Sequence, residues 1–481
     1  MITDLKPYAV MKDLGVPWLG EVPGHWELLR NGQLFAQRNE TGFPDLPILE
    51  VSLKTGVRVR TFESSNRKQI MADREKYKRA RKGDVTYNMM RMWQGAVGVA
   101  PLDGLVSPAY VVARPLPETD SRYYEYLFRV GRYMDETNKF SRGIVSDRNR
   151  LYWQDFKQMP SPFPPSKEQA AIVRFLDYVD RRIRRYIRAT QKLIKLLEEQ
   201  KQAIVHRAVT RGLDPNVRLN PSGVEWLGDV PEHWDLRRLK SLVRRIDQGV
   251  SPQAENYLVE GDAWGVLKAG CVNRGVFRET EHKRLPVGFE FDPSLVVEVG
   301  DTLVSRASGS PHLVGSVGRV PSVKYKLILS DKTFRPVFNQ DLEADFMVLA
   351  MNSRYYRQQV ERAISGAEGL ANNLPLSSLR AFVFVIPPVE EQRTIIEYLR
   401  KATDGLRATG AHAEAEIALL REYRIRLIAD VVTGKLDVRA AAANLLDESD
   451  EPEALDDTDA LPEGDEPADG DLDAAPEDAE A

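Results

Sequence analysis

The chain has 481 residues, more than one hydrophobic core usually serves, so two or more domains are expected. Its 42% apolar and 29% charged residues are typical of a globular protein, and the absence of an apolar run of about 18 residues argues against a membrane span. A single cysteine, Cys271, excludes an internal disulfide and a cysteine-based zinc site, and the N-terminus lacks an apolar signal core, so we expect a cytoplasmic protein.

The first segment, residues 1–163, is predicted to be a compact domain. It opens with a phrase rich in Trp and Pro, VPWLGEVPGHWELLR at 16–30. Short β-rich runs such as LPILEVSL, AVGVAPL and AYVVARPL follow, separated by Gly, Pro and Asp, and a helical patch lies at 121–135. This pattern favours an α+β domain of about 150 residues.

The second segment, residues 164–214, is predicted to be one long helix, because no Asn, Gly or Pro occurs from 166 to 211. Ser166 is the predicted N-cap, with Gln169 at the capping-box position. At 1.5 Å per residue the helix would be roughly 65–70 Å long. Apolar residues recur at alternating spacings of four and three, which indicates a coiled-coil seam that includes Ile172, Leu176, Val179, Ile183, Tyr186, Leu193, Leu197 and Ile204.

The chain then repeats this organisation. VEWLGDVPEHWDLRRL at 224–239 echoes the first phrase 208 positions later, so His25 corresponds to His233 and Trp26 to Trp234. KGDVTYNMMR at 82–91 matches VGDTLVSRAS at 299–308, and PPSKEQAAIVRFLD at 164–177 matches PPVEEQRTIIEYLR at 387–400. We predict a second domain at 215–386 and a second long helix at 387–437, antiparallel to the first, with seam residues Ile395, Leu399, Leu406, Leu420 and Leu427.

The final segment, residues 438–481, is predicted to be a disordered acidic tail. From Asp447 onward it has 17 Asp and Glu and neither Lys nor Arg. The whole chain has a net charge of −4, but without this segment 54 acidic residues face 67 basic ones, a surplus of 13 positive charges. A basic body favours a polyanionic partner.

The duplicated pattern resembles the DNA-specificity subunits of Type I restriction–modification systems. The residues that carry the resemblance are the two Trp/Pro phrases, GD at 83–84 and 300–301, the two PP-x-x-EQ helix entries, and the helix exits AVTRGLD and VVTGKLD. It covers roughly residues 14–437. The resemblance implies an α+β fold with two pseudo-symmetric α/β target-recognition domains separated by two long antiparallel coiled-coil helices.

The resemblance also implies a function. The chain would be a non-catalytic subunit that recognises a bipartite, asymmetric site in double-stranded DNA and scaffolds two methyltransferase subunits and restriction/translocase subunits. The assembled complex would be an adenine-specific DNA methyltransferase and ATP-dependent endonuclease. S-adenosylmethionine, ATP and magnesium are implied for those partners.

No catalytic or metal site is expected on the chain itself. It lacks the Gly-rich loop of a methyltransferase, the G-x-x-x-x-G-K-[ST] loop of a translocase and any paired-histidine metal spacing, so no cofactor is expected to bind. We interpret His25 and His233 as hydrogen-bonding the backbone rather than holding metal.

Base readout in such domains is expected from Arg, Asn and Gln on loops, with Lys, Arg and Ser on phosphates. In the first domain the candidates are Lys54, Arg58, Arg60, Arg67, Lys68, Asn88, Arg91, Gln94, Arg142, Arg148 and Asn149. In the second they are Lys268, Asn273, Arg274, Ser305, Arg306, Ser308, Asn372 and Asn373. Because the two sets differ, the two half-sites should differ. The sequence gives neither the bases nor the length of the spacer between them.

Three other interpretations stay open at this stage. The chain could be a coiled-coil scaffold whose β-rich domains bind protein, an orphan specificity subunit without active partners, or a stand-alone methyltransferase. Arg and Asn loops at matching positions of both repeats favour DNA. For the tail, one hypothesis is that it competes with DNA phosphates for basic clefts, and the alternative is that it only aids solubility.

Overall fold

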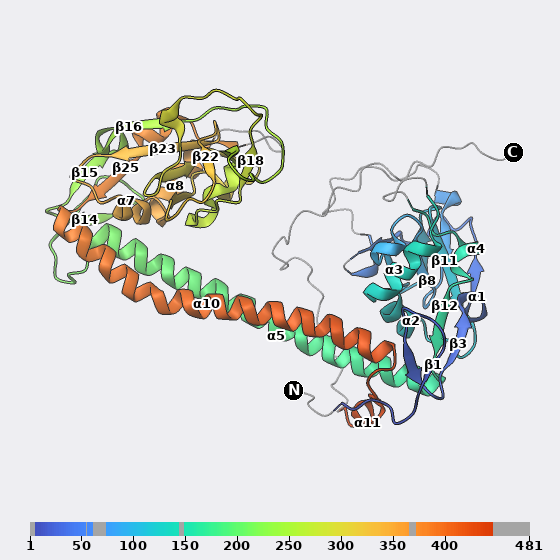
Figure 1. The fold of residues 1–481 in the computed structure, drawn as a ribbon. Coiled ribbons are helices and arrows are strands. Elements are labelled where there is room, and N and C mark those ends of the chain that lie inside the picture. Colours follow the sequence, from blue (N-terminus) through green and yellow to red (C-terminus); the bar gives the residue numbers. More distant parts are fainter. Residues whose placement is uncertain (1–4, 54, 61–73, 144–148, 365–371, 446–481) are drawn as a thin grey trace. The chain divides into compact units, whose positions relative to one another are not determined.

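A computed structural model describes residues 5–53, 55–60, 74–143, 149–364 and 372–445 (Figure 1). The chain divides into two compact units, Met1–Arg188 with Glu416–Ala481, and Ala189–Ala415. Both units mix helices and strands, as predicted. Within the described ranges no helix is long and apolar enough to cross a membrane.

The first unit is built on a four-stranded antiparallel sheet in the order β4-β11-β8-β9. Its strands are β4 (Phe35–Arg38), β8 (Val85–Asn88), β9 (Val97–Val99) and β11 (Tyr110–Pro115). Two-stranded pairs surround it: β1 (Met11–Asp13) with β2 (Glu21–Pro23), β3 (Glu27–Arg30) with β12 (Pro160–Phe163), β5 (Leu49–Ser52) with β6 (Gly56–Val59), and β7 (Lys78–Ala80) with β10 (Gly104–Val106).

Aromatic side chains fill the core of the first unit. Phe35 from the sheet meets Tyr124 and Phe128 from the helical layer, and all three are almost fully buried. Their rings meet edge-on or tilted, the geometry that aromatic quadrupoles favour. The helices of this unit are α1 (Asn31–Leu34), α2 (Ser121–Phe128), α3 (Gly131–Phe140) and α4 (Trp153–Phe156), with 3-10 turns η1 (Arg74–Lys76) and η2 (Met92–Gln94).

The second unit repeats the central sheet in the order β16-β23-β19-β21. Its strands are β16 (Val243–Gln248), β19 (Thr302–Ser305), β21 (Val317–Arg319) and β23 (Thr333–Phe338). The register is also repeated: Phe35 faces Pro115 in the first sheet, and Val243 faces Phe338 in the second. A bulge between Val243 and Arg245 adds one residue to β16.

The second unit also has elements of its own. A separate three-stranded sheet, β18-β17-β22, has its own apolar core. It consists of β17 (Trp264–Leu267), β18 (His282–Arg284) and β22 (Lys326–Ile328). The remaining elements are β13 (Leu219–Pro221), β14 (Asp229–Pro231), β15 (Asp235–Arg238), β20 (Ala307–Ser308), β24 (Asn372–Asn373), β25 (Val383–Ile386), α6 (Leu239–Leu242), α7 (Ala344–Ala350), α8 (Arg354–Ala363), α9 (Leu376–Ala381), η3 (Ala269–Gly275), η4 (Pro293–Leu295) and η5 (Pro311–Leu313).

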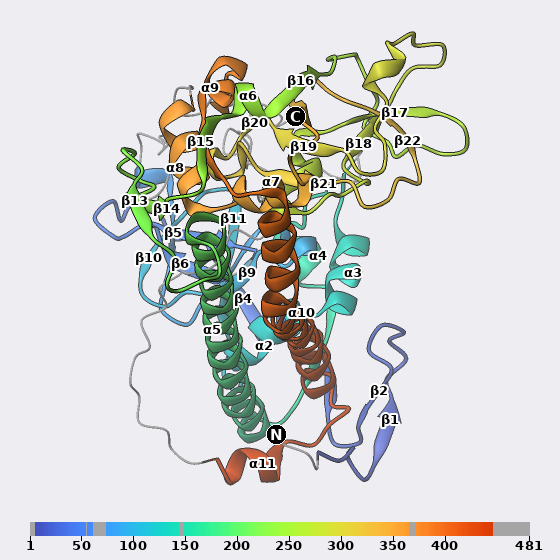
Figure 2. The same cartoon turned by 90° about the vertical axis from the view of Figure 1, so that its left-hand side faces the viewer.

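The two predicted long helices are α5 (Ser166–Arg211) and α10 (Val389–Val432). Figures 1 and 2 show them side by side. In the first unit, the N-terminal part of α5 packs through Leu176 against Leu427 near the end of α10. In the second unit, Val209 near the end of α5 shares a core with Ile395 near the start of α10. The helices are therefore antiparallel.

The seam follows the predicted heptads except at two positions of α5, where the next residue along the chain is the more buried one. Tyr186 and Leu193 are 48% and 46% exposed, whereas Ile187 and Ile194 are partly buried. Leu193 was therefore wrongly assigned to the seam. Of the other predicted positions, Ile172, Leu176, Ile183, Ile395, Leu399 and Leu427 are buried, and Val179, Leu197, Ile204, Leu406 and Leu420 are partly buried.

The predicted tail begins too early in the chain. Val438 is fully buried, and α11 (Arg439–Ala443) follows it with Ala442 buried against the first unit. An apolar residue followed by a run of alanines has both the surface and the helix propensity to pack there. Only residues 446–481 lie outside the described part of the C-terminal segment.

Candidate nucleic-acid interface

The repeated phrase binds the start of each long helix. In the first unit, Glu168 in the first turn of α5 is 5% exposed and accepts three hydrogen bonds. Trp26 Nε1 lies 2.8 Å, His25 Nε2 2.7 Å and Tyr8 Oη 2.6 Å from its carboxylate oxygens. The helix N-terminus also favours a negative charge at this position. Burial and the bond to Glu168 raise the pKa of Tyr8.

The second unit repeats this contact in a simpler form. His233 Nε2 and Trp234 Nε1 lie 2.9 and 3.0 Å from Oε2 of Glu391, in the first turn of α10. The Glu391 side chain is 29% exposed, so this version is more open to solvent. In both units the histidine binds a carboxylate, so our assignment to the backbone was wrong.

The glutamine of each EQ pair ties the helix entry to the domain. Gln169 Nε2 donates to the carbonyl of Pro164 at 2.8 Å, and its Oε1 accepts from the Asp120 amide at 2.8 Å. Gln392 makes the matching bonds to Pro387 and Glu343, at 2.9 and 2.8 Å. Gln169 therefore does not form the predicted capping box with Ser166, because its amide spans the Pro-Pro turn instead.

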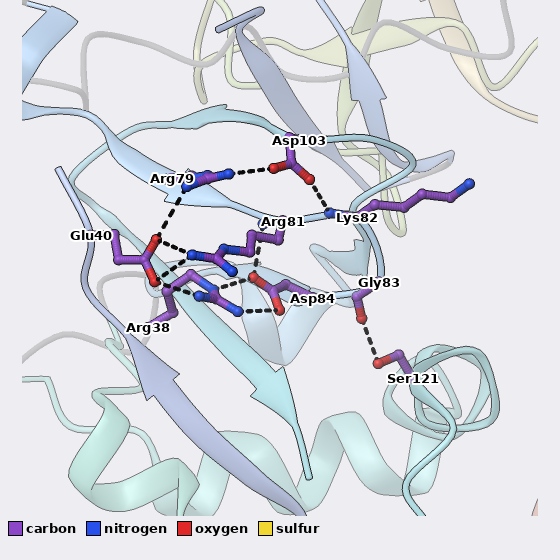
Figure 3. A network of polar contacts seen from close by, with 9 residues as sticks. All are labelled: Arg38, Glu40, Arg79, Arg81, Lys82, Gly83, Asp84, Asp103 and Ser121. Carbon is purple, nitrogen blue, oxygen red and sulfur yellow. Dashed lines mark hydrogen bonds and ion pairs between the residues drawn. The ribbon is translucent and has the colours of Figure 1, made fainter. Parts of the chain in front are cut away.

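The GD motif forms a turn that starts a central strand of each sheet (Figure 3). Gly83 and Gly300 both have φ of +90°, a conformation that favours glycine. Asp84 accepts from the backbone amide of Arg81 at 2.8 Å, and Asp301 accepts from that of Glu298 at 3.0 Å. The motif thus fixes where β8 and β19 begin.

A buried ion pair anchors the same turn. Arg38 on β4 lies 2.6 Å from Asp84 and 2.5 Å from Glu40, with only 8% of its side chain exposed (Figure 3). Burial opposes the charge of Arg38, but the hydrogen bonds and opposite charges of Asp84 and Glu40 together outweigh burial, so the net pKa is raised. Two further arginines, Arg79 and Arg81, also lie within ion-pair distance of Glu40.

In the second unit the arginine that anchors the GD turn lies on β23, the strand next to β16. Arg335 on β23 faces Asp247 on β16 and lies 2.9 Å from it and 3.0 Å from Asp301. By register, Asp247 takes the place of Arg38, and Arg335 takes the place of Val112. The pairing of opposite charges is preserved although the side chains have changed strands.

From this anchor, β8 leads to a loop that holds three candidates. Asn88 ends the strand, and its side-chain Oδ1 accepts from the Met90 amide at 2.9 Å. Gln94 is exposed at the end of η2, and Arg91 is partly buried before it. Trp93 donates its indole N–H to the Met90 carbonyl at 3.0 Å, so it stabilises its own loop.

A distant segment joins this loop. The Leu151 amide donates to the Met89 carbonyl at 2.8 Å, which places Asn149 and Arg142 near the Asn88 loop. The Arg142 side chain is 76% exposed although it contacts Asp155 at 2.5 Å. The Asn149 amide binds Asn138 at 2.8 Å. The sequence reasoning missed Tyr152, which is 43% exposed beside them and suits stacking on a base.

The other first-domain candidates divide into two groups. Arg58 on β6 lies 2.6 Å from Glu50 on the paired strand, so a phosphate would have to compete with this ion pair. Arg60 follows directly, and its amide bonds to the Ile48 carbonyl. The remaining four fall outside the described residues: Lys54, Arg67, Lys68 and Arg148.

In the second unit Ser305 was wrongly predicted to contact DNA. It ends β19 fully buried, and its hydroxyl donates to the Ala269 carbonyl at 3.2 Å. All four residues of β19 are buried, so neither face of this strand is open to solvent. The bond nevertheless places η3 beside the end of β19.

The remaining candidates of the second domain gather around this contact. Ser308 on β20 pairs with Asn372 on β24, and the Arg306 carbonyl accepts from the Leu374 amide at 2.8 Å. Arg306 donates to the Asp331 carbonyl at 3.0 Å, next to Lys332, a cation that the sequence reasoning missed. Asn373 pairs with Ala307 in the same short ladder.

On η3, Arg274 is the most accessible candidate. It is exposed and has φ of +57°, a left-handed conformation that is uncommon for a residue other than glycine. Asn273 is partly buried, and its Oδ1 is buried without a hydrogen-bond partner. Lys268 precedes the turn and is partly buried. Each unit therefore presents a group of polar and basic side chains at the end of the strand that the GD turn anchors.

Comparisons with known proteins agree on one family. The family described as "Type I restriction modification DNA specificity domain" matches residues 23–196. The EcoEI specificity subunit of Escherichia coli is 30% identical over 208 residues, which are 43% of this chain but only 34% of that protein. The putative MjaX specificity subunit of Methanocaldococcus jannaschii is 23% identical over 88% of this chain and 96% of its own length.

A solved structure supports the fold. It comes from work on complex assembly and conformational transition of the type I R-M system, and it covers 86% of this chain and 99% of its own, with a TM-score of 0.61 and 18% identity. The repeated helix entries and GD turns, the two mixed domains and these relatives lead to one conclusion. Residues 23–196 match the Type I restriction modification DNA specificity domain, and the chain as a whole is similar to specificity subunits of Type I restriction enzymes.

Proposed function

We propose that this chain is a non-catalytic subunit that reads a bipartite, asymmetric sequence in double-stranded DNA, each unit reading one half. The observation that carries the proposal is a repeated frame with different side chains at its ends. Both frames use the same histidine, tryptophan, glutamate and glutamine contacts. At the strand ends, however, Asn88 in one unit corresponds to the buried Ser305 in the other.

Recognition would divide between bases and phosphates. The exposed Gln94 and Arg274 are suited to base edges, because amide and guanidinium groups form paired hydrogen bonds in the major groove. Arg142, with its side chain 76% exposed, is suited to phosphate, where it would add affinity without sequence preference. Neighbouring exposed groups such as Tyr152 would add stacking or apolar contact.

The catalytic steps would belong to partner subunits. The proposed partners are two methyltransferase subunits and restriction/translocase subunits, which would supply S-adenosylmethionine, ATP and magnesium chemistry. The residues that the structure describes include no group of three His, Cys, Asp or Glu side chains that could hold a metal ion. The role of this chain would be to position those partners on the sequence that it binds.

The deciding experiment is modified-base sequencing of host DNA with the gene intact, deleted, or carrying variants in one unit. We expect methylated adenine in a split, asymmetric motif that disappears on deletion. Q94A should relax one half of the motif and R274A the other, whereas K12A, a change on β1 away from both groups, should alter neither. Unchanged methylation after deletion, or both variants affecting the same half-site, would contradict the proposal.

A further inference from the structure

Lys78 is a half-buried cation at the start of β7, in the strand pair β7–β10. Its Nζ donates to the Tyr110 carbonyl at 2.9 Å, and this carbonyl is its one polar partner within the described ranges. Burial lowers the pKa of Lys78, and no charged neighbour adds to that shift. A buried ammonium usually has a carboxylate beside it, because taking its charge out of water is costly. The charge of Lys78 is left uncompensated by the residues that the structure describes.

The neighbouring arginines show that acidic residues are present in this part of the fold. Arg79, the next residue on β7, lies 2.7 Å from Asp103 and 3.6 Å from Glu40 (Figure 3). Arg81 lies 3.3 Å from the same Glu40. Successive side chains of a strand point to opposite faces, so Arg79 meets these acids on the face that Lys78 does not share.

Lys78 instead faces the same space as Asn88. Lys78 lies opposite Val106 on β10, and Val106 packs in an apolar cluster with Val112 of the central sheet. From the sheet, Tyr110 packs against the same cluster and lies opposite Asn88, the last residue of β8. Residues directly opposite each other in an antiparallel pair project from the same face. Lys78 and Asn88 therefore approach one space from two layers of the first unit.

This space lies beside the loop that carries candidate base contacts of the first unit. The Met89 amide donates to the Ala109 carbonyl at 3.4 Å, one residue before the carbonyl that Lys78 binds. Because each base is joined to the phosphates of its own strand, a base held at Asn88 brings a phosphate into the same neighbourhood. An ammonium without a carboxylate partner is suited to that phosphate.

We propose that Lys78 binds a DNA phosphate beside Asn88 and thereby fixes the register of the first half-site. The phosphate supplies the negative charge that Lys78 otherwise lacks, in a partly desolvated place where a charge-assisted hydrogen bond is strong. The contact has no base preference of its own, but it holds the strand so that neighbouring side chains can read it. This inference rests on the proposed function, because it requires that the first unit binds DNA.

The salt dependence of DNA binding by the full chain tests the contact. K78M keeps the apolar stem and removes the charge. Losing one phosphate contact should lower the slope of log affinity against log salt by about 0.9, so the loss in affinity should shrink about 3.5-fold between 50 and 200 mM salt, on duplexes of any sequence. K78R should keep the slope. The matched control is K435M, which should also keep it, since Lys435 likewise donates to a backbone carbonyl, that of Leu19 at 3.1 Å, but has Glu21 and Asp430 nearby.

Amide hydrogen exchange separates a binding role from a structural one. In the free chain the ammonium is buried without an opposite charge, so K78M should exchange the amides of β7 and β11 no faster than wild type. Faster exchange with an unchanged salt slope would mean that Lys78 only holds the Tyr110 carbonyl, and would overturn the proposal. A loss of affinity confined to one duplex sequence would assign Lys78 to a base edge and would also overturn it.

These measurements distinguish this inference from the proposed function. A wild-type chain that binds duplex DNA without preferring any sequence would contradict sequence reading, while a lower slope in K78M would still support the phosphate contact. A sequence-specific chain whose slope is unchanged in K78M would overturn this inference alone. A chain that binds no duplex DNA would overturn both.

Discussion

The contact between the repeated phrase and the helix entry occurs twice, so one substitution can be compared in two settings. In E168A, the buried donors of Trp26 and Tyr8 lose their acceptor, at about 1–3 kcal/mol each, and a total cost of about 3–5 kcal/mol is expected. In E391A, only His233 and Trp234 lose a more exposed acceptor, and we expect about 1 kcal/mol. Both variants also lose the favourable interaction of a carboxylate with the helix N-terminus, so this contribution cancels when the two costs are compared.

The difference of about 2–4 kcal/mol corresponds to roughly a 30- to 900-fold difference in local opening. Amide hydrogen exchange measures it within each unit, which avoids assuming that a chain of two units unfolds in one step. E168A should speed exchange in Glu27–Arg30, and E391A should speed it far less in Asp235–Arg238. E168Q, which keeps an acceptor, should fall between wild type and E168A. If E391A opened its strand as much as E168A does, burial of the carboxylate would not be the source of the stability.

Four further outcomes are expected. R335M should destabilise the second unit by about 3 kcal/mol in hydrogen exchange, because two acids then meet without their cation; an effect below about 1 kcal/mol would contradict this. Burial lowers the pKa of His206 below 6.5, so the folded form binds fewer protons than the unfolded form. The second unit should therefore lose stability as pH falls through 6.5. H206Q should remove this dependence of stability on pH, and an unchanged dependence would refute the prediction. G434A should lower the first unit's melting temperature, because φ is +72° and a Cβ would lie 2.2 Å from Pro23 Cδ. R91A should cost about 1–3 kcal/mol for the first half-site alone in binding assays, and equal loss on all sequences would assign Arg91 to phosphate instead.

The sequence predicted the architecture well where a pattern has only one physical solution. Forty-six residues without Asn, Gly or Pro, with an apolar repeat, can hardly be anything but a long helix. The duplicated phrase and GD motif likewise indicated two similar domains, although not what the motifs do. The side-chain hydrogen bonds of the Trp and His residues of the phrase join residues more than 140 positions apart, such as Trp26 and Glu168, and no local pattern encodes that pairing.

The candidate site was less predictable because exposure at a loop depends on the whole domain. Ser305 looked equivalent to Asn88, but every residue of its strand is buried. Tyr152 was missed because only the backbone bond between Leu151 and Met89 brings its segment to the loop. Leu193 was misplaced by a single residue, because Leu193 and Ile194 are both apolar and the spacing of apolar residues does not distinguish between such neighbours.

The buried arginine lies on β4 in the first unit, as Arg38, but on β23 in the second, as Arg335. This difference limits how such domains could be recombined. A crossover that put β16 in place of β4 would bring Asp247 beside Asp84, with Val112 opposite and no cation between the carboxylates. The reciprocal exchange would set Arg38 against Arg335. Each strand is compatible only with the neighbouring strands of its own sheet. A viable exchange of specificity between such proteins would therefore have to transfer the gene segment that encodes the whole sheet.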